Sequence, residues 1–522
     1  MRKILAILFI TAMIFSLASC NDVDFTSKYG DPNKTTALTC PRLMTGVFYK
    51  GNQYTFNSYW RIFTWDYSGI GRYSQTLGTF NSDSRYQFSD SYYSDRWNNF
   101  YSLLAQYREL ESTYNKLDDT NKAYNEVYVL LARVFMYDHL IQVADCWGDI
   151  PFSKAGFLPV STDASTATPV YDTAESIYLA VLEDLKTINS SLNLMSSSLS
   201  SDVKASLKIQ DFINKGDLSL WRKYCNSLRL RVATEVADNG TIKTQAQAAI
   251  KEMLNDPTTY PMIDSNTENI KVTPDEDGFK YGNEYQDGWE TWVGELNRAS
   301  QAMVDALLGD ARIDVIFDKN SAGNYVGVDT HTDYATQSSY FERPRTENYY
   351  CSLDSATFNR NRKLPGMIIS AAEVAFNKAN AYSKGYATGD AKTAFVNGII
   401  LSTQYYYQIN ATSTYRDPLT APSTTIVRTF AEAKWNAATN KDEAISTQLW
   451  LNFGFLQTTQ AWTSVRRTGY PVLYFPVDNS SATVTNVPNR LRYPPSERNL
   501  NTTNYNAFKS KDNFTEKMFW AK

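Results

Sequence analysis

The sequence predicts a mainly α-helical, exported protein whose helices pack in pairs and carry long surface loops. Three observations support this fold class. Apolar side chains recur at three- and four-residue steps over several long stretches, as on one face of a helix. The segment 257–365 lacks that period and is rich in Asn, Asp, Gly, Tyr and Ser, a composition typical of long loops. A basic start and an apolar run open the chain, which is typical of a secretory signal.

The N-terminal segment 1–19 is predicted to be a signal peptide. Arg2 and Lys3 precede the apolar run 4–15, and small residues lead to Cys20. The run is short for a membrane span, and its small-residue exit favours cleavage over a buried N-terminal helix. The letters LASC resemble a bacterial lipobox. That resemblance implies that Cys20 is lipidated and begins the mature protein, so that the protein is anchored to a membrane without spanning it.

The rest of the composition argues against several classes of protein. No later apolar run approaches the about 18–20 residues of a membrane-spanning helix. The net charge is -4, and Lys and Arg do not cluster, so nucleic acid is not expected as a partner. The remaining cysteines are far apart and show no CxxC spacing, which favours free or buried thiols over two disulfides. They are Cys40, Cys146, Cys225 and Cys351.

The first half of the chain contains four helical patterns. Those over 97–110 and 122–144 are joined by a short polar turn and predict a helical hairpin. The third begins at Asp172, which we expect to cap the helix while Glu175 reaches back, as in a capping box. The fourth covers 217–237, where we expect two arginines, Arg229 and Arg231, to pair with carboxylates.

In the second half, one short helix is expected near 299–308 within the loop-rich segment. Helical patterns return over 366–385, 390–407, 429–438 and 443–462. From Gly469 the chain is rich in Pro and Asn and is expected to wrap the surface. The helical pairs suggest TPR-like packing, although the chain has no strict repeat of about 34 residues.

Several motifs, in order, resemble the SusD/RagB family of Bacteroidetes outer-membrane lipoproteins. Each motif marks only a helix start, a helix end or a turn, and it is their order and spacing that is specific. The likeness covers nearly the whole mature chain, with departures at Asn380, where relatives usually carry Glu, and at Cys146, which occupies a variable position. The motifs are DPNK (31–34), DCWGDIPFSKA (145–155), WRKYCNSLRLRVA (221–233), LPGMIISAAEVAFNKANAYSKGY (364–386), AWTSVRRTGYPVL (461–473) and PNRLRYPPSERNLN (488–501).

The resemblance implies a single SusD-like domain over 20–522, with TPR-like helical pairs supporting a loop-rich, ligand-facing side. It implies a SusC-type TonB-dependent outer-membrane transporter as partner, and oligosaccharides, or sometimes peptides, as ligand. Asp22 and Asp24 are similar to the acidic signals that send such lipoproteins to the cell surface. The expected location is therefore the outer membrane, lipid-anchored and exposed to the exterior.

Aromatic residues form 14% of the chain, with 36 Tyr and 11 Trp. In an exported protein this favours a surface for sugar rings, whose C–H faces pack on aromatic rings. Two segments, 65–93 and 279–292, combine aromatic with amide and acidic side chains. The expected stacking residues are Trp65, Tyr73, Trp289 and Trp292, and the expected hydrogen-bonding residues are Asn81, Asp83, Asn283 and Asp287. The alternative is that these aromatic rings pack between loops and helices.

Catalysis and metal binding have little support. The two histidines, His139 and His331, belong to no metal-binding motif or triad, and no catalytic residue is expected. The loop 318–329 is spaced partly like an EF-hand, but Ala322 and Asp329 occupy positions that require other ligands. We therefore expect a structural turn there and no cofactor. The alternatives to glycan capture are peptide capture and, more remotely, a surface glycan hydrolase with two facing carboxylates.

Overall fold

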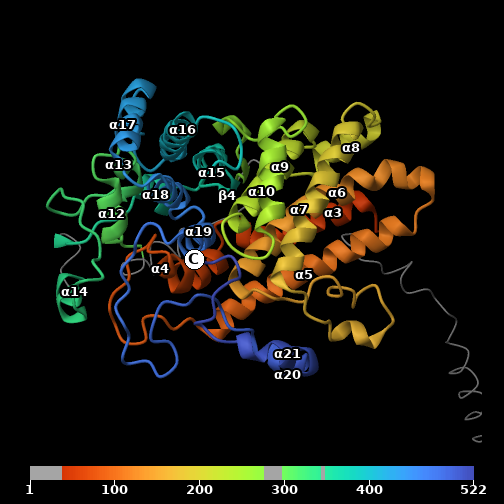
Figure 1. The fold of residues 1–522 in the computed structure, drawn as a ribbon, viewed down its shortest axis with the longest axis horizontal. Helices are drawn as coiled ribbons and strands as arrows, with labels where there is room; N and C mark the ends of the chain where they lie inside the picture. Colours follow the sequence, from red (N-terminus) through yellow and green to blue (C-terminus); the bar gives the residue numbers. More distant parts are fainter. Residues whose placement is uncertain (1–37, 275–296, 342–346) are drawn as a thin grey trace, which may run out of the picture. The chain divides into compact units, whose positions relative to one another are not determined.

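The computed structural model describes residues 38–274, 297–341 and 347–522, and residues Cys40–Lys522 form one compact unit (Figure 1). The fold is mainly α-helical, as predicted. In the first half the elements are α3 (Cys40–Thr55), η1 (Trp60–Ile70), α4 (Gly71–Tyr73), α5 (Asp90–Asn115), α6 (Asp119–Trp147), η2 (Ala164–Ala167), α7 (Ala174–Met195), α8 (Ser201–Gln210), α9 (Leu218–Val236), α10 (Lys243–Asn255), η3 (Asn266–Glu268) and β1 (Ile270–Val272).

The second half contains short elements followed by a second set of long helices. They are α12 (Gln301–Leu307), α13 (Ile313–Ile316), β2 (Phe317–Asp318), α14 (Tyr334–Phe341), β3 (Ser352–Leu353), η5 (Ser355–Asn359), β4 (Gly366–Ile369), α15 (Ala371–Ser383), α16 (Ala391–Thr412), α17 (Thr424–Ala437), α18 (Lys441–Phe453), α19 (Thr458–Thr468), α20 (Pro495–Leu500), α21 (Thr502–Phe508) and η6 (Lys509–Lys511). Strand β1 pairs with β4, and β2 with β3, both antiparallel.

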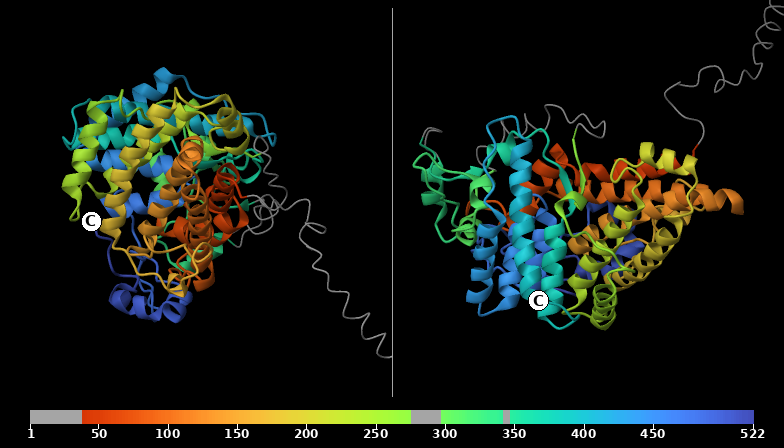
Figure 2. Two further views of the ribbon diagram at one scale, coloured as in Figure 1. Left: turned by 90° about the vertical axis from the view of Figure 1, so that its right-hand side faces the viewer. Right: turned by 90° about the horizontal axis from the view of Figure 1, so that it is seen from above.

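Helices that are neighbours in sequence pack in pairs. The predicted hairpin is confirmed as α5 and α6, α7 packs on α9, and α15 packs on both α16 and α18. Figure 2 shows the teal and blue helices of the second set standing side by side. Two apolar cores result, one mainly among α3–α10 and one mainly among α12–α19.

Helix α6 is the central helix of the first core. It is the one helix in the described ranges that is long and apolar enough to cross a membrane, but 89% of that apolar window is buried in the protein. The Asp118 carboxylate accepts the N–H of Asn121 and caps its start. Gly148 follows the last turn at φ 77°, a left-handed conformation that favours glycine.

The last carbonyl oxygens of α6 accept hydrogen bonds from residues far along the chain. An α-helix leaves its last four carbonyl oxygens without partners of its own. Gly148 N–H donates to the Ala144 carbonyl, and Leu491 N–H donates to that of Cys146. The carbonyls of Asp145 and Trp147 accept from Arg466 and Arg490, which lie 321 and 343 positions further on. The C-terminal segment therefore closes this helix end as well as covering the surface.

Three predicted element boundaries are wrong. The N-cap of α7 is Thr173, whose hydroxyl accepts the N–H of Ser176. Asp172 instead accepts the N–H groups of Phe152 and Ser153, because a β-bridge to Ile150 places it there.

The predicted helix over 366–385 begins as strand β4, since residues 366–369 pair with β1. The predicted helix over 443–462 is two helices, α18 and α19, separated at Gly454, which has a φ of 43°. Both differences come from conformations that apolar periodicity alone does not distinguish.

The four cysteines at positions 40, 146, 225 and 351 are all buried and free, as expected. The pairing of Arg229 and Arg231 with carboxylates is also confirmed. Arg229 Nη2 lies 3.0 Å from Glu252 Oε2.

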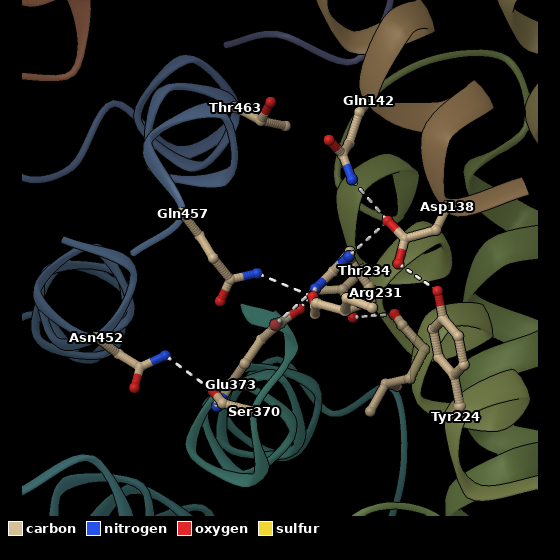
Figure 3. Close-up of polar contacts among 12 residues, drawn as sticks. Asp138, Gln142, Tyr224, Arg231, Thr234, Ser370, Glu373, Asn452, Gln457 and Thr463 are labelled. Carbon is tan, nitrogen blue, oxygen red and sulfur yellow. Dashed lines mark hydrogen bonds and ion pairs between the residues drawn. The ribbon is translucent and has the colours of Figure 1, made fainter. Parts of the chain in front are cut away.

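Arg231 forms a buried ionic network that joins three helices (Figure 3). Its guanidinium lies 2.5 Å from a carboxylate oxygen of Glu373 on α15 and 3.2 Å from one of Asp138 on α6. It also donates to the Ile368 carbonyl of β4 at 2.6 Å. Asp138 accepts in addition from Tyr224 and Gln142, both at 2.8 Å. The network thus connects α6 and α9 in the first core to α15 and β4.

We expect Arg231→Met to lower the free energy of unfolding by about 3–5 kcal/mol, because Asp138 and Glu373 would stay buried without their cation. Urea unfolding followed by circular dichroism at neutral pH measures the loss. The penalty should shrink as the pH is lowered, because burial raises the pKa of Glu373 and its protonation removes an unpaired buried charge.

The matched control is Arg498→Met, which removes the ion pair with the exposed Asp90 at 3.5 Å. It should cost at most about 1 kcal/mol. Equal losses for the two variants would show that the buried network does not hold these helices together.

Candidate functional site

Two of the expected stacking residues lie in the core. Trp65 is 2% exposed, and its ring is covered by Tyr54, Phe88 and Trp147. Its indole N–H donates to the Thr459 hydroxyl at 2.9 Å. A sugar has no open ring face here, so the expectation for Trp65 is wrong.

Tyr73 is likewise 2% exposed. Its hydroxyl donates to the Tyr86 carbonyl at 2.7 Å, and its ring packs against Trp462 at 5.7 Å. The expectation for Tyr73 is wrong for the same physical reason. Both rings lie on helical segments, η1 and α4, where no helix was predicted.

The two polar residues expected in the same segment lie at the surface or just below it. The half-buried Asn81 side chain donates to the carbonyls of Thr330 at 2.8 Å and Thr332 at 2.7 Å. Its own N–H donates to Gln337 at 2.6 Å. Asp83, two residues on, is exposed. Asn81 therefore holds a loop in place, whereas Asp83 is open to a ligand.

The remaining expected residues, Asn283, Asp287, Trp289 and Trp292, lie outside the described residues. Their proposed contact with a sugar stays a prediction.

The loop held by Asn81 leads into a group of aromatic side chains around α14, at the lower left of Figure 1. Tyr340 and Tyr349 stack with ring centroids 4.0 Å apart and planes 15° apart. His331 and Tyr474 stack in the same way at 4.2 Å and 12°. Tyr334 and Tyr474 are 49% and 48% exposed. We call His331, Tyr334, Tyr340, Tyr349 and Tyr474 the α14 surface.

A second layer of rings supports the α14 surface from beneath. Phe80 lies edge-on to Phe341 at 5.5 Å and to Tyr350 at 5.9 Å. The Arg298 guanidinium lies 5.8 Å from the Phe341 ring. These contacts join Phe80, just before Asn81, to the last residue of α14 and to Tyr350 beyond it, so the surface rings rest on packed rings.

Carboxylates lie among the rings. The Asp329 carboxylate is 2.9 Å from Nδ1 of His331 and also accepts the His331 N–H. Asp333 accepts the N–H and hydroxyl of Thr336, and these hydrogen bonds hold the pKa of Asp333 below its usual value. Asp333 is therefore ionised at neutral pH, and its carboxylate can accept hydrogen bonds from hydroxyl groups. Flat rings beside such acceptors match the needs of a sugar.

No sequence motif predicts this surface. His331 was considered only as a catalytic or metal-binding residue, and Tyr334, Tyr340 and Tyr349 lie in the predicted loop-rich segment 257–365. The available signal was the density of tyrosine over residues 334–350. What the sequence did not reveal was that Tyr474, far along the chain, stacks against His331.

A second concavity lies between α15 and α16. It has a volume of about 260 Å³, and its lining includes Lys378, Tyr382 and Asn397. Burial lowers the pKa of Lys378 below its usual value. This groove has one aromatic ring, whereas the α14 surface has several, so the latter fits a row of sugar rings better.

The loop 318–329 acts as a structural turn. The Asp318 carboxylate accepts from Ser355 and lies 2.9 Å from Arg416. The Asn320 amide oxygen accepts two N–H groups of its own turn. These protein donors occupy the oxygens that an EF-hand would aim at calcium. Within the described ranges, no group of three or more His, Cys, Asp or Glu side chains is placed to hold a metal.

His139 lies in the core against Phe135 and Thr55. Burial, and then the charge of Arg96, holds the pKa of His139 well below its usual range. It is therefore a neutral buried imidazole.

Comparison with known proteins identifies relatives of this fold. A family model, SusD-like_2, described as starch-binding and associating with the outer membrane, matches residues 32–494. No curated protein matches the chain.

Three solved structures are similar over more than nine tenths of the chain. One, described as a chitin-binding protein, has a TM-score of 0.74 at 21% identity, over 92% of this chain and 100% of its own. A chitin-binding SusD homologue from Flavobacterium johnsoniae has a TM-score of 0.68 at 19% identity, over 91% and 98%. A SusD-like protein from Bacteroides thetaiotaomicron has a TM-score of 0.66 at 21% identity, over 92% and 99%. At these identities the likeness establishes the fold.

We expect Asn81→Ala to loosen the loop that carries His331. Losing two side-chain hydrogen bonds of about 1 kcal/mol each should speed amide exchange over 329–334 by roughly tenfold or more. Hydrogen exchange read by mass spectrometry measures this, with the overall unfolding transition as reference. Asp83→Ala is the neighbouring control and should leave the exchange unchanged. An unchanged rate in Asn81→Ala would mean that the α14 packing alone holds the loop.

Proposed function

The chain belongs to the SusD-like family, described as starch-binding and associating with the outer membrane, and from this premise we propose that it is a surface-exposed lipoprotein that binds nutrient oligosaccharides. The observation that carries the proposal is the α14 surface. It offers stacked and exposed rings beside the carboxyl groups of Asp329 and Asp333, on a fold that solved chitin-binding proteins share.

Binding on this surface requires no covalent chemistry. Affinity would come from ring stacking and from hydrogen bonds of hydroxyl groups to Asp83, Asp329 and Asp333. We therefore propose a binding protein and not an enzyme. The four residues outside the described ranges, Asn283, Asp287, Trp289 and Trp292, remain candidates for further contacts.

We further propose that the bound oligosaccharide passes to a SusC-type TonB-dependent transporter in the outer membrane. Family membership supports this partner, and the lipobox-like segment at Cys20 supports an anchor that keeps the two proteins on one membrane. The relatives described as chitin-binding make N-acetylglucosamine oligomers the first ligands to test, beside starch oligomers and a peptide library.

The double variant Tyr334→Ala with Tyr474→Ala should weaken oligosaccharide binding by roughly tenfold or more, because each lost ring contact is worth about 0.5–1.5 kcal/mol. Isothermal titration calorimetry with the best oligosaccharide from a glycan array measures the change. Circular dichroism should show an unchanged helical signal.

Two further variants make the result specific. Tyr124→Ala removes an equally exposed tyrosine on α6 and should leave binding unchanged. Tyr382→Ala tests the groove between α15 and α16. If Tyr382→Ala abolishes binding and the double variant does not, the site lies in that groove. Trp289→Ala with Trp292→Ala tests the remaining candidates and should also reduce retention.

Replacing Cys20 with Ser should release the protein from membranes, because the thiol that would carry the lipid is removed. Fractionation of cells into membrane and soluble parts measures this, with Cys40→Ser as the matched cysteine control. Unchanged membrane attachment in Cys20→Ser would contradict lipidation at this residue.

A further inference from the structure

A small cavity lies where the two halves of the chain meet. It is bounded by the end of α3, by η1, α5, α6 and β4, and by the start of α19. Its volume, taken as the space open to the centre of a water-sized sphere, is about 40 Å³. One water needs about 10–15 Å³ by the same measure, so the cavity has room for about three non-hydrogen atoms. It is far too small for a sugar, and it is distinct from the α14 surface.

Arg96 on α5 lines this cavity without a counter-ion. Its side chain is 2% exposed. It donates from Nη2 to Nδ1 of His139 at 3.3 Å, and its guanidinium lies 4.8 Å from the Tyr54 ring. Its other terminal nitrogen, Nη1, is buried and has no hydrogen-bond partner. Among the described residues, no carboxylate oxygen lies within 4.0 Å of this guanidinium.

The other buried arginines nearby are paired. Arg61, on the cavity wall, lies 3.4 Å from Asp66 and donates to the Thr55 carbonyl at 2.6 Å. Arg231 has two carboxylates, and although burial acts against it, Glu373 and then Asp138 raise its pKa. For Arg96, in contrast, burial prevails and lowers the pKa below its usual value.

No carboxylate on the wall is left free to contact Arg96. Burial lowers the pKa of Arg96 more than the charges of Asp138 and Asp95 raise it, and Asp138 is engaged by Arg231, Gln142 and Tyr224, as described above. His139 is neutral. Gln460 of α19 also lines the cavity, and its Nε2 is buried without a partner. Two residues of the wall, Arg96 and Gln460, therefore carry unused N–H donors, one of them cationic.

We propose that this cavity is a binding site for a small monovalent anion, chloride or formate, held by Arg96 and Gln460. Water molecules would satisfy the N–H donors but not the buried positive charge. A chloride ion or formate has the charge and a size that the cavity admits. The anion would join α5 of the first core to α19 of the second half.

An anion that binds only the folded protein raises its melting temperature in a saturable way. We would follow thermal unfolding of the purified protein at constant ionic strength while sodium chloride, bromide, formate or acetate replaces sodium gluconate, whose anion is too large to enter. The expected result is a saturable rise of a few degrees. The anion that saturates at the lowest concentration identifies the chloride or the carboxylate source.

Arg96→Met should abolish this anion dependence. The matched control Arg229→Met removes a buried arginine that pairs with Glu252 outside the cavity; it should lower the melting temperature and keep the anion dependence. A response that is absent in the unaltered protein, or equal in Arg96→Met, would overturn the proposal.

Crystals grown in bromide give a test that does not need the variant to fold. An anomalous difference peak within hydrogen-bond distance of Arg96 Nη1 is expected. A cavity that contains only water in such crystals would contradict the proposed anion site.

Discussion

The charge of Arg231 is the constraint around which the two cores are arranged. A buried guanidinium is tolerated only if carboxylates and carbonyls surround it, and here those partners come from α6, α15 and β4. The partners lie far apart in sequence, so all of these elements must reach their final positions before the charge is satisfied. Apolar packing alone would accept several relative placements of the helices. The ionic network favours one of them, and the small cavity beside Arg96 lies against the same junction.

Sequence periodicity predicted the long helices because a helix that buries one face repeats its apolar residues at fixed steps. Helices α5 and α7 show this clearly, since their buried residues recur at three- and four-residue steps. It failed where a conformation depends on a distant partner, as at residues 366–369, which are extended because they pair with β1. The capping error at Asp172 has the same origin, since two adjacent residues were both suitable caps and a bridge to Ile150 decided between them.

The sequence predicted which kinds of side chain form the candidate site, but it did not predict where in the fold they lie. Composition indicated an aromatic surface, and such a surface exists around α14. Trp65 and Tyr73 were chosen because their segment lacked helical periodicity, yet their rings fill the core. A ring in an irregular segment can face the solvent or the core, and its direction depends on the residues that surround it in the folded protein. The stacking of Tyr474 on His331 joins residues that no local pattern connects.

The closed end of α6 has a consequence for how the protein reaches its folded state. The carbonyls of Asp145 and Trp147 accept hydrogen bonds from arginines that lie 321 and 343 positions downstream. Along the export route proposed above, the chain would cross a membrane from its N-terminal end, and the α5–α6 hairpin would emerge long before the segment that completes it. Contacts of such long range slow folding and leave apolar surface open meanwhile. The hairpin would therefore need protection from aggregation during secretion, until the C-terminal segment arrives.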